Sequence, residues 1–164
     1  MKGLWEYISA KAKYALSPRQ VMSLIMFVLG LFNMGLLIFF VIYSIYPMVL
    51  VSMFSVALYI YCFIQASRDK NLLLVFNLSY AEIMIHAVAS VLLMGVDSGF
   101  SLYIIAMLPL GYYASYNFSS EKKSVNPMLY VLFSGVAFCF ARILGSSMDP
   151  LYSYGNKSID RAMY

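Results

Sequence analysis

Hydrophobic residues are gathered into five long runs along the chain, and short polar segments separate each run from the next. A helix needs about 20 residues to cross the hydrocarbon core of a membrane, and each run approaches or exceeds that length. The pattern therefore predicts an all-α fold, a polytopic membrane helix bundle with five transmembrane helices. Their expected limits are residues 21–43, 48–66, 72–94, 101–118 and 128–145.

Capping residues mark the start of the first and the last run. Ser17 and Gln20 have the Ser-x-x-Gln spacing of a capping box, and Pro18 occupies the first helical position. The pair Asn126-Pro127 repeats this start before the fifth run. Both helices are therefore predicted to begin at these positions.

Two terminal segments lie outside the transmembrane domain, which we assign to residues 20–146. Residues 1–19 form a basic arm, in which residues 3–16 place apolar side chains near one helical face. This spacing predicts a short N-terminal interfacial helix with Trp5 at headgroup depth. Residues 147–164 form a polar and aromatic tail without a sixth apolar run.

The amino-acid composition excludes an ordinary soluble domain. Hydrophobic residues make up 63% of the 164 residues and charged residues only 11%, whereas soluble domains carry roughly 25% charged residues. Five spans use about 100 residues. No soluble catalytic domain is therefore expected, and we predict a protein that is not an enzyme and needs no cofactor.

The placement of the basic residues predicts the orientation. Eight of the eleven lysine and arginine residues lie before the first run, between the second and third, or between the fourth and fifth. These segments share one side if five helices alternate, and cytoplasmic segments carry the excess of positive charge. We expect a multi-pass protein of the bacterial inner membrane with a cytoplasmic N-terminus and an external C-terminus. The sequence contains no dense basic patch of the kind that would indicate nucleic-acid binding.

Metal and redox motifs are missing from the sequence. Cys62 and Cys139 both fall inside apolar runs, without the spacing of a metal site or a disulfide framework. His86 is the single histidine. No metal is therefore expected.

Three ionisable side chains inside the predicted spans need a reason to be there. A charged residue at a helix centre costs about 2.5–3.5 kcal/mol on insertion scales. Glu82 and His86 are four residues apart, so they share one face of the third helix. Arg142 lies near the outer end of the fifth helix, and Asp97 follows the outer end of the third.

These positions predict a pocket in the outer half of the bundle that binds a small ligand. The candidate binding residues are Glu82, His86, Asp97, Arg142, Tyr103 and Asn33. The alternative is structural, in which Glu82 and His86 bond to each other or to a neighbouring helix while Arg142 reaches the outer headgroups.

A resemblance to a known family rests on the order of several short motifs. A basic arm with Ser17-Pro18-Arg19 precedes two uncharged spans, and the third span carries Tyr80-Ala81-Glu82 and His86-Ala87. Gly95 and Asp97-Ser98-Gly99-Phe100 follow. This order resembles the N-terminal multi-pass membrane sensor region of bacterial GGDEF-domain diguanylate cyclases and related membrane-anchored cyclases. The resemblance implies six spans and a cytoplasmic catalytic domain, so the chain is expected to be truncated before a sixth helix.

The sequence therefore favours a sensory or regulatory membrane domain. It would detect an external or membrane-dissolved small ligand and act on a cyclic-dinucleotide output outside this chain, as a homodimer or with a partner signalling protein. The alternative is a small transporter or a substrate-binding membrane subunit that uses Glu82 and His86 as a proton or substrate relay. In a third possibility, a structural subunit, these two residues only fix helix packing.

Overall fold

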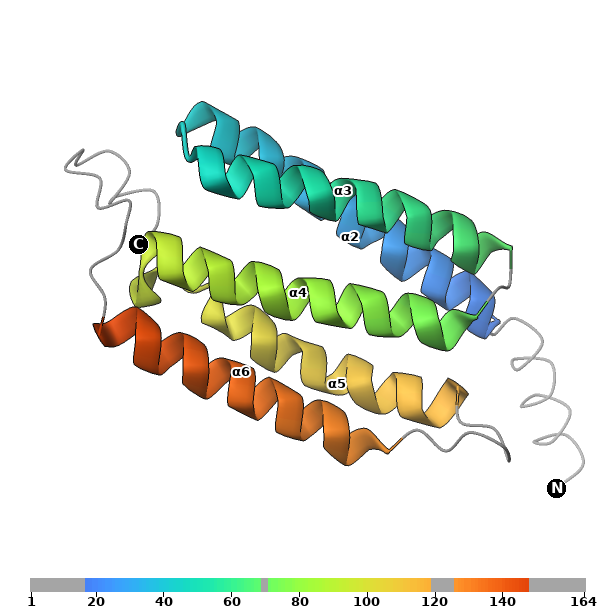
Figure 1. The fold of residues 1–164 in the computed structure, drawn as a ribbon. Coiled ribbons are helices and arrows are strands. Elements are labelled where there is room, and N and C mark those ends of the chain that lie inside the picture. Colours follow the sequence, from blue (N-terminus) through green and yellow to red (C-terminus); the bar gives the residue numbers. More distant parts are fainter. Residues whose placement is uncertain (1–16, 69–70, 119–125, 148–164) are drawn as a thin grey trace, which may run out of the picture.

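The computed structural model describes residues 17–68, 71–118 and 126–147. This part of the chain forms five long α-helices that lie side by side and reverse direction at each connection (Figure 1). The first residues of α2, α4 and α6 therefore lie at one end of the bundle. The elements are α2 (Pro18–Ile42), α3 (Tyr46–Ser67), α4 (Leu72–Met94), the 3₁₀ helix η1 (Val96–Ser98), α5 (Ser101–Phe118) and α6 (Pro127–Ser147).

The predicted capping box at the start of α2 is confirmed. The Ser17 hydroxyl accepts a hydrogen bond from the Gln20 backbone N–H at 3.3 Å, and the Gln20 side chain accepts one from the Ser17 N–H at 2.9 Å. This reciprocal pair satisfies two donors that the first turn of a helix leaves without partners. At the same end of the bundle, the Arg19 guanidinium donates to the carbonyl of Ser67, the last residue of α3.

The prediction of five transmembrane helices is wrong for the fourth run. Within the described residues, α2, α3, α4 and α6 are long and apolar enough to cross a membrane, and α5 is not among them. Polar positions explain the difference, because Pro109 and a run of tyrosines that includes Tyr112, Tyr113 and Tyr116 interrupt the apolar residues of α5. The predicted interfacial helix, at residues 3–16, lies outside the described residues, as do the arm up to residue 16 and the tail from residue 148.

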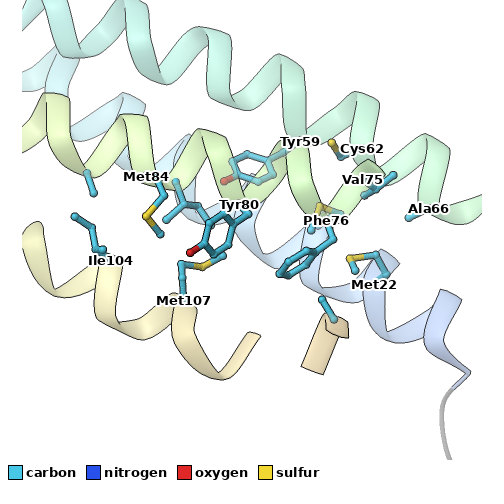
Figure 2. Close-up of a cluster of buried hydrophobic side chains, with 14 of the residues drawn as sticks. Met22, Tyr59, Cys62, Ala66, Val75, Phe76, Tyr80, Met84, Ile104 and Met107 are labelled. Carbon is cyan, nitrogen blue, oxygen red and sulfur yellow. The ribbon is translucent and has the colours of Figure 1, made fainter. Parts of the chain in front are cut away.

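Helix α4 lies at the centre of the packing. Half of its most apolar window is buried, whereas the corresponding share of α6 is 11%. Figure 2 shows Tyr80 and Met84 of α4 packed with side chains of its neighbours, among them Tyr59 from α3 and Met107 from α5. Polar residues on the inner face of α4, Glu82 and His86 among them, are therefore held inside the protein rather than against lipid.

Two glycines allow the helices to approach closely. A Cβ atom at Gly145 of α6 would lie 2.6 Å from a methyl carbon of Val91 and 2.7 Å from one of Val96. A Cβ atom at Gly111 of α5 would lie 2.9 Å from the Cβ atom of Tyr130 in α6. All three distances are shorter than a Cβ contact normally is, so the close packing of α6 against α4, η1 and α5 depends on glycine at these positions.

Candidate functional site

The buried carboxylate of Glu82 is the centre of a polar cluster between α3 and α4. Glu82 is 6% exposed. Its Oε1 accepts a hydrogen bond from the Ser55 hydroxyl and its Oε2 accepts one from the Tyr59 hydroxyl, both from α3. His86 adds a third contact, because its Nδ1 lies 3.2 Å from Glu82 Oε1. The cluster thus supplies the donors that a carboxylate needs when it is removed from water.

The two ring nitrogens of His86 have different surroundings. Its Nδ1 lies 3.2 Å from the Ser55 hydroxyl as well as from Glu82. Its Nε2 is buried and has no hydrogen-bond partner. The ring of Phe40 lies beside the imidazole, with centroids 6.4 Å apart. The imidazole therefore contacts the Glu82 cluster through Nδ1, whereas its Nε2 is left without a hydrogen-bond partner.

A cavity of about 180 Å³ lies between α2, α4 and α5, and His86 is one of its lining residues. We call it the Asn33 cavity. Apolar and aromatic side chains supply most of its wall, and Asn33, Glu82, His86 and Tyr103 are the lining residues with polar side chains. The apolar and aromatic members are Leu29, Phe32, Leu36, Ile83, Ala87, Phe100, Ala106, Met107 and Leu110.

Asn33 lines this cavity from α2 and is 5% exposed. Its Nδ2 donates to the carbonyl of Leu29 at 3.2 Å, one turn earlier. Its Oδ1 is buried and has no partner. An asparagine amide in the middle of an apolar helix therefore presents one acceptor that the protein does not use.

Aromatic rings form the outer part of the cavity wall. The Tyr103 ring centroid lies 5.6 Å from that of Phe32 on α2 and 5.6 Å from that of Phe100. Phe32 and Tyr103 are 41% and 40% exposed. The Asn33 cavity thus borders the outer surface of the bundle at these two rings.

A second cavity, of about 270 Å³, lies between α2 and α3, and we call it the Gly30 cavity. Its wall is apolar except for Tyr59, and several of its residues are exposed on the surface of the bundle. The lining residues are Met26, Phe27, Gly30, Leu31, Met34, Val56, Tyr59, Ile60 and Phe63.

The structure brings together four of the six predicted ligand-binding residues, because Asn33, Glu82, His86 and Tyr103 all line the Asn33 cavity. Asp97 lies in η1 and Arg142 on α6, and both are exposed and outside the cavity wall.

Sequence analysis missed Ser55 and Tyr59, the partners of Glu82 on α3. A signal was present in the sequence, because small or polar residues recur on one face of α3 at helical spacing. All of them are buried: Ser52, Ser55, Tyr59, Cys62 and Ala66.

The described side chains include no group of three or more histidine, cysteine, aspartate or glutamate residues that could hold a metal ion. Cys62 is buried and Cys139 is exposed, and neither forms a disulfide. The Glu82 cluster and the Asn33 cavity supply hydrogen-bonding groups, an imidazole and an apolar wall, which suit binding through hydrogen bonds and apolar contact or the movement of a proton.

Comparison with known proteins gives no relative. No protein-family model, no curated protein and no solved structure matches the chain. The four candidate spans, together with the large apolar side chains exposed on α2, α3 and α6, define a multi-pass helical membrane protein that contacts the lipid bilayer.

Proposed function

We propose that this protein is a sensory or regulatory membrane protein that binds a small, largely apolar molecule in the Asn33 cavity. The observation that carries the proposal is the position of the cavity between two parts of the bundle. Its wall comes from α2 on one side and from α4 and α5 on the other. Helix α2 packs chiefly against α3, and its contacts with α4 are few. A bound molecule would therefore join helices that otherwise touch little.

Such a molecule acts as a signal only through its preference for one helix arrangement. A ligand that binds one of two arrangements tenfold more tightly shifts their equilibrium by about 1.4 kcal/mol. The exposed rings of Phe32 and Tyr103 support entry of the ligand from within the membrane, because they place the cavity beside the lipid-facing surface.

The proposal also includes the membrane orientation of the protein and its signalling output. The segments before α2, α4 and α6, together with the first turn of α2, carry eight of the eleven basic residues, which supports a cytoplasmic N-terminus and an external C-terminus in a bacterial inner membrane. The motif order around Glu82 and His86 supports an effect on cyclic-dinucleotide signalling, exerted through a homodimer or a partner signalling protein. Labelling of a single cysteine placed at Ser17 or at Ser147 in a C62A/C139A background, on intact and on permeabilised cells, tests the orientation.

A variant that fills the cavity tests ligand binding. Ala87 lines the Asn33 cavity, whereas Ala81 lies on the exposed face of the same helix. In a thermal-shift screen of small apolar compounds on the detergent-purified protein, we expect hits for the wild type and for Ala81→Leu that disappear in Ala87→Leu. Hits that persist in Ala87→Leu, or an absence of hits from the wild type, would contradict binding in this cavity.

The helix response needs a second measurement. Spin labels placed on the exposed Leu50 of α3 and the exposed Leu132 of α6 report the distance between the α2–α3 pair and the remaining helices. A compound that raises the melting temperature should change this distance, and it should leave the distance in Ala87→Leu unchanged. A distance that stays unchanged when the cavity is saturated with ligand would contradict a sensory role.

A transporter is the second candidate function, and one observation favours it. His86 contacts the Glu82 carboxylate through Nδ1 and lines the cavity, an arrangement that a proton relay also requires. Proton or solute flux in proteoliposomes that is lost in Glu82→Gln would support transport in place of sensing.

A further inference from the structure

Two unused hydrogen-bond atoms occur among the residues that line the Asn33 cavity. Within the described part of the chain, three buried side-chain polar atoms have no partner, and these are Asn33 Oδ1, Ser52 Oγ and His86 Nε2. Asn33 and His86 come from different helices and both line this one cavity. Buried polar groups are nearly always paired, because an unpaired one costs the free energy of its lost hydration.

The amide of Asn33 is oriented by its own helix. Its Nδ2 donates to the Leu29 carbonyl, which only an N–H group can do. The unpaired atom is therefore the oxygen, a hydrogen-bond acceptor.

The imidazole of His86 is oriented by Glu82. A carboxylate accepts hydrogen bonds, so the Nδ1 that lies 3.2 Å from Glu82 Oε1 carries the hydrogen. In the neutral ring, Nε2 is then also an acceptor. Glu82 itself is already occupied, because its two oxygens accept from Ser55 and Tyr59.

The size and the wall of the cavity limit the rest of the ligand. An apolar cavity of about 150 Å³ is known to hold one benzene molecule, and the Asn33 cavity measures about 180 Å³. The rings of Phe32, Phe100 and Tyr103 in its wall favour an apolar or aromatic body of about one ring.

Building on the proposed function, we propose that the ligand of the Asn33 cavity is a compact molecule with a one-ring-sized apolar body and a hydrogen-bond donor head group. The head group is an amino group, which can donate to both Asn33 Oδ1 and His86 Nε2, or a hydroxyl, whose single hydrogen is donated to Asn33 Oδ1. A pure hydrocarbon of the same size offers these two acceptors nothing, so it binds more weakly.

Three fluorinated probes of nearly equal size test this proposal. The probes are 4-fluorotoluene, 4-fluorobenzyl alcohol and 4-fluorobenzylamine, titrated by ¹⁹F NMR against the full chain in lipid nanodiscs. Signal from the cavity is the saturable shift that disappears in Ala87→Leu, or in Ala106→Leu if the first variant does not fold, and that protein-free nanodiscs do not give. We expect the alcohol or the amine to bind about tenfold more tightly than fluorotoluene, the effect of about one to two hydrogen bonds. The tighter of the two identifies the head group.

A matched pair of asparagine variants locates the preference. Asn33→Leu should reduce the advantage of the donor probes to threefold or less while fluorotoluene still binds. Asn77→Leu, at an exposed asparagine of α4 outside the cavity, should leave the tenfold advantage unchanged.

The results separate this inference from the proposed function. Equal cavity affinity for all three probes in the wild type would overturn the donor head group, whereas ligand binding in the cavity would stand. A preference that survives Asn33→Leu would equally overturn the assignment to Asn33. The absence of any cavity signal from the three probes would overturn this ligand class, and the thermal-shift screen would then decide alone whether the cavity binds other molecules.

Discussion

Helix α2 borders two cavities, and they differ in what their walls contain. The Gly30 cavity is the larger, about 270 Å³ against about 180 Å³, and methionine, phenylalanine and aliphatic side chains supply most of its wall. The smaller Asn33 cavity contains two buried acceptors without partners. Volume alone would favour the Gly30 cavity as a binding site. Selectivity instead requires polar atoms at fixed places in an apolar wall, and only the Asn33 cavity supplies them among the residues described.

The largest expected effect tests whether the Asn33 cavity belongs to the folded core. Met107 lines it and is 4% exposed, whereas Met34 lines the Gly30 cavity and is 45% exposed. Met107→Ala should lower the free energy of unfolding by at least about 2 kcal/mol, because truncation removes the packing contacts of a buried side chain. Met34→Ala should lower it by about 0.5 kcal/mol or less. Reversible unfolding in detergent measures both, and equal losses would remove the distinction between a cavity wall that is part of the core and one that is exposed.

The next effect concerns Tyr59, the lining residue that the Gly30 cavity shares with the Glu82 cluster. Tyr59→Phe deletes one of the donors to a buried carboxylate, and it should cost about 1.5–3 kcal/mol. Tyr61→Phe on the exposed face of the same helix is the control and should change stability little. A Tyr59→Phe protein as stable as the control would show that Glu82 does not need this donor.

The smallest effects come from a pair of glycines. A Cβ atom at Gly30 would meet Tyr59 Cβ at 3.5 Å, an ordinary contact, whereas one at Gly111 would meet Tyr130 Cβ at 2.9 Å. Gly30→Ala should therefore change the free energy of unfolding by less than about 1 kcal/mol, with the better helix propensity of alanine acting in its favour. Gly111→Ala should cost about 1–3 kcal/mol through overpacking. Matched thermal unfolding curves of the two variants would reveal a reversal of this order.

Local rules were sufficient to predict much of the fold. The apolar runs give the positions of all five helices, and the Ser17 capping box forms as its spacing predicts. Helix α5 shows where run length fails as a guide, because length alone does not distinguish a lipid-facing span from a helix whose tyrosines and Pro109 lower its hydropathy.

The site could be predicted only in part. Glu82 and His86 pair as an i, i+4 spacing allows, since both positions belong to one helix. The bonds from Ser55 and Tyr59 depend on how α3 is rotated against α4, which no local pattern determines. Depth along the helices assigns Asp97 and Arg142 to the same level of the bundle as His86. Depth does not determine which face of the bundle a residue occupies. Both residues are exposed and outside the cavity wall.

The bond from Arg19 to the Ser67 carbonyl has a mechanical consequence. It joins the beginning of α2 to the end of α3, while the short turn between Ile42 and Tyr46 joins their other ends. Two helices that are joined at both ends are expected to move together as one unit. A molecule in the Asn33 cavity that displaces α2 is therefore expected to displace α3 with it, including the end of α3 at Ser67.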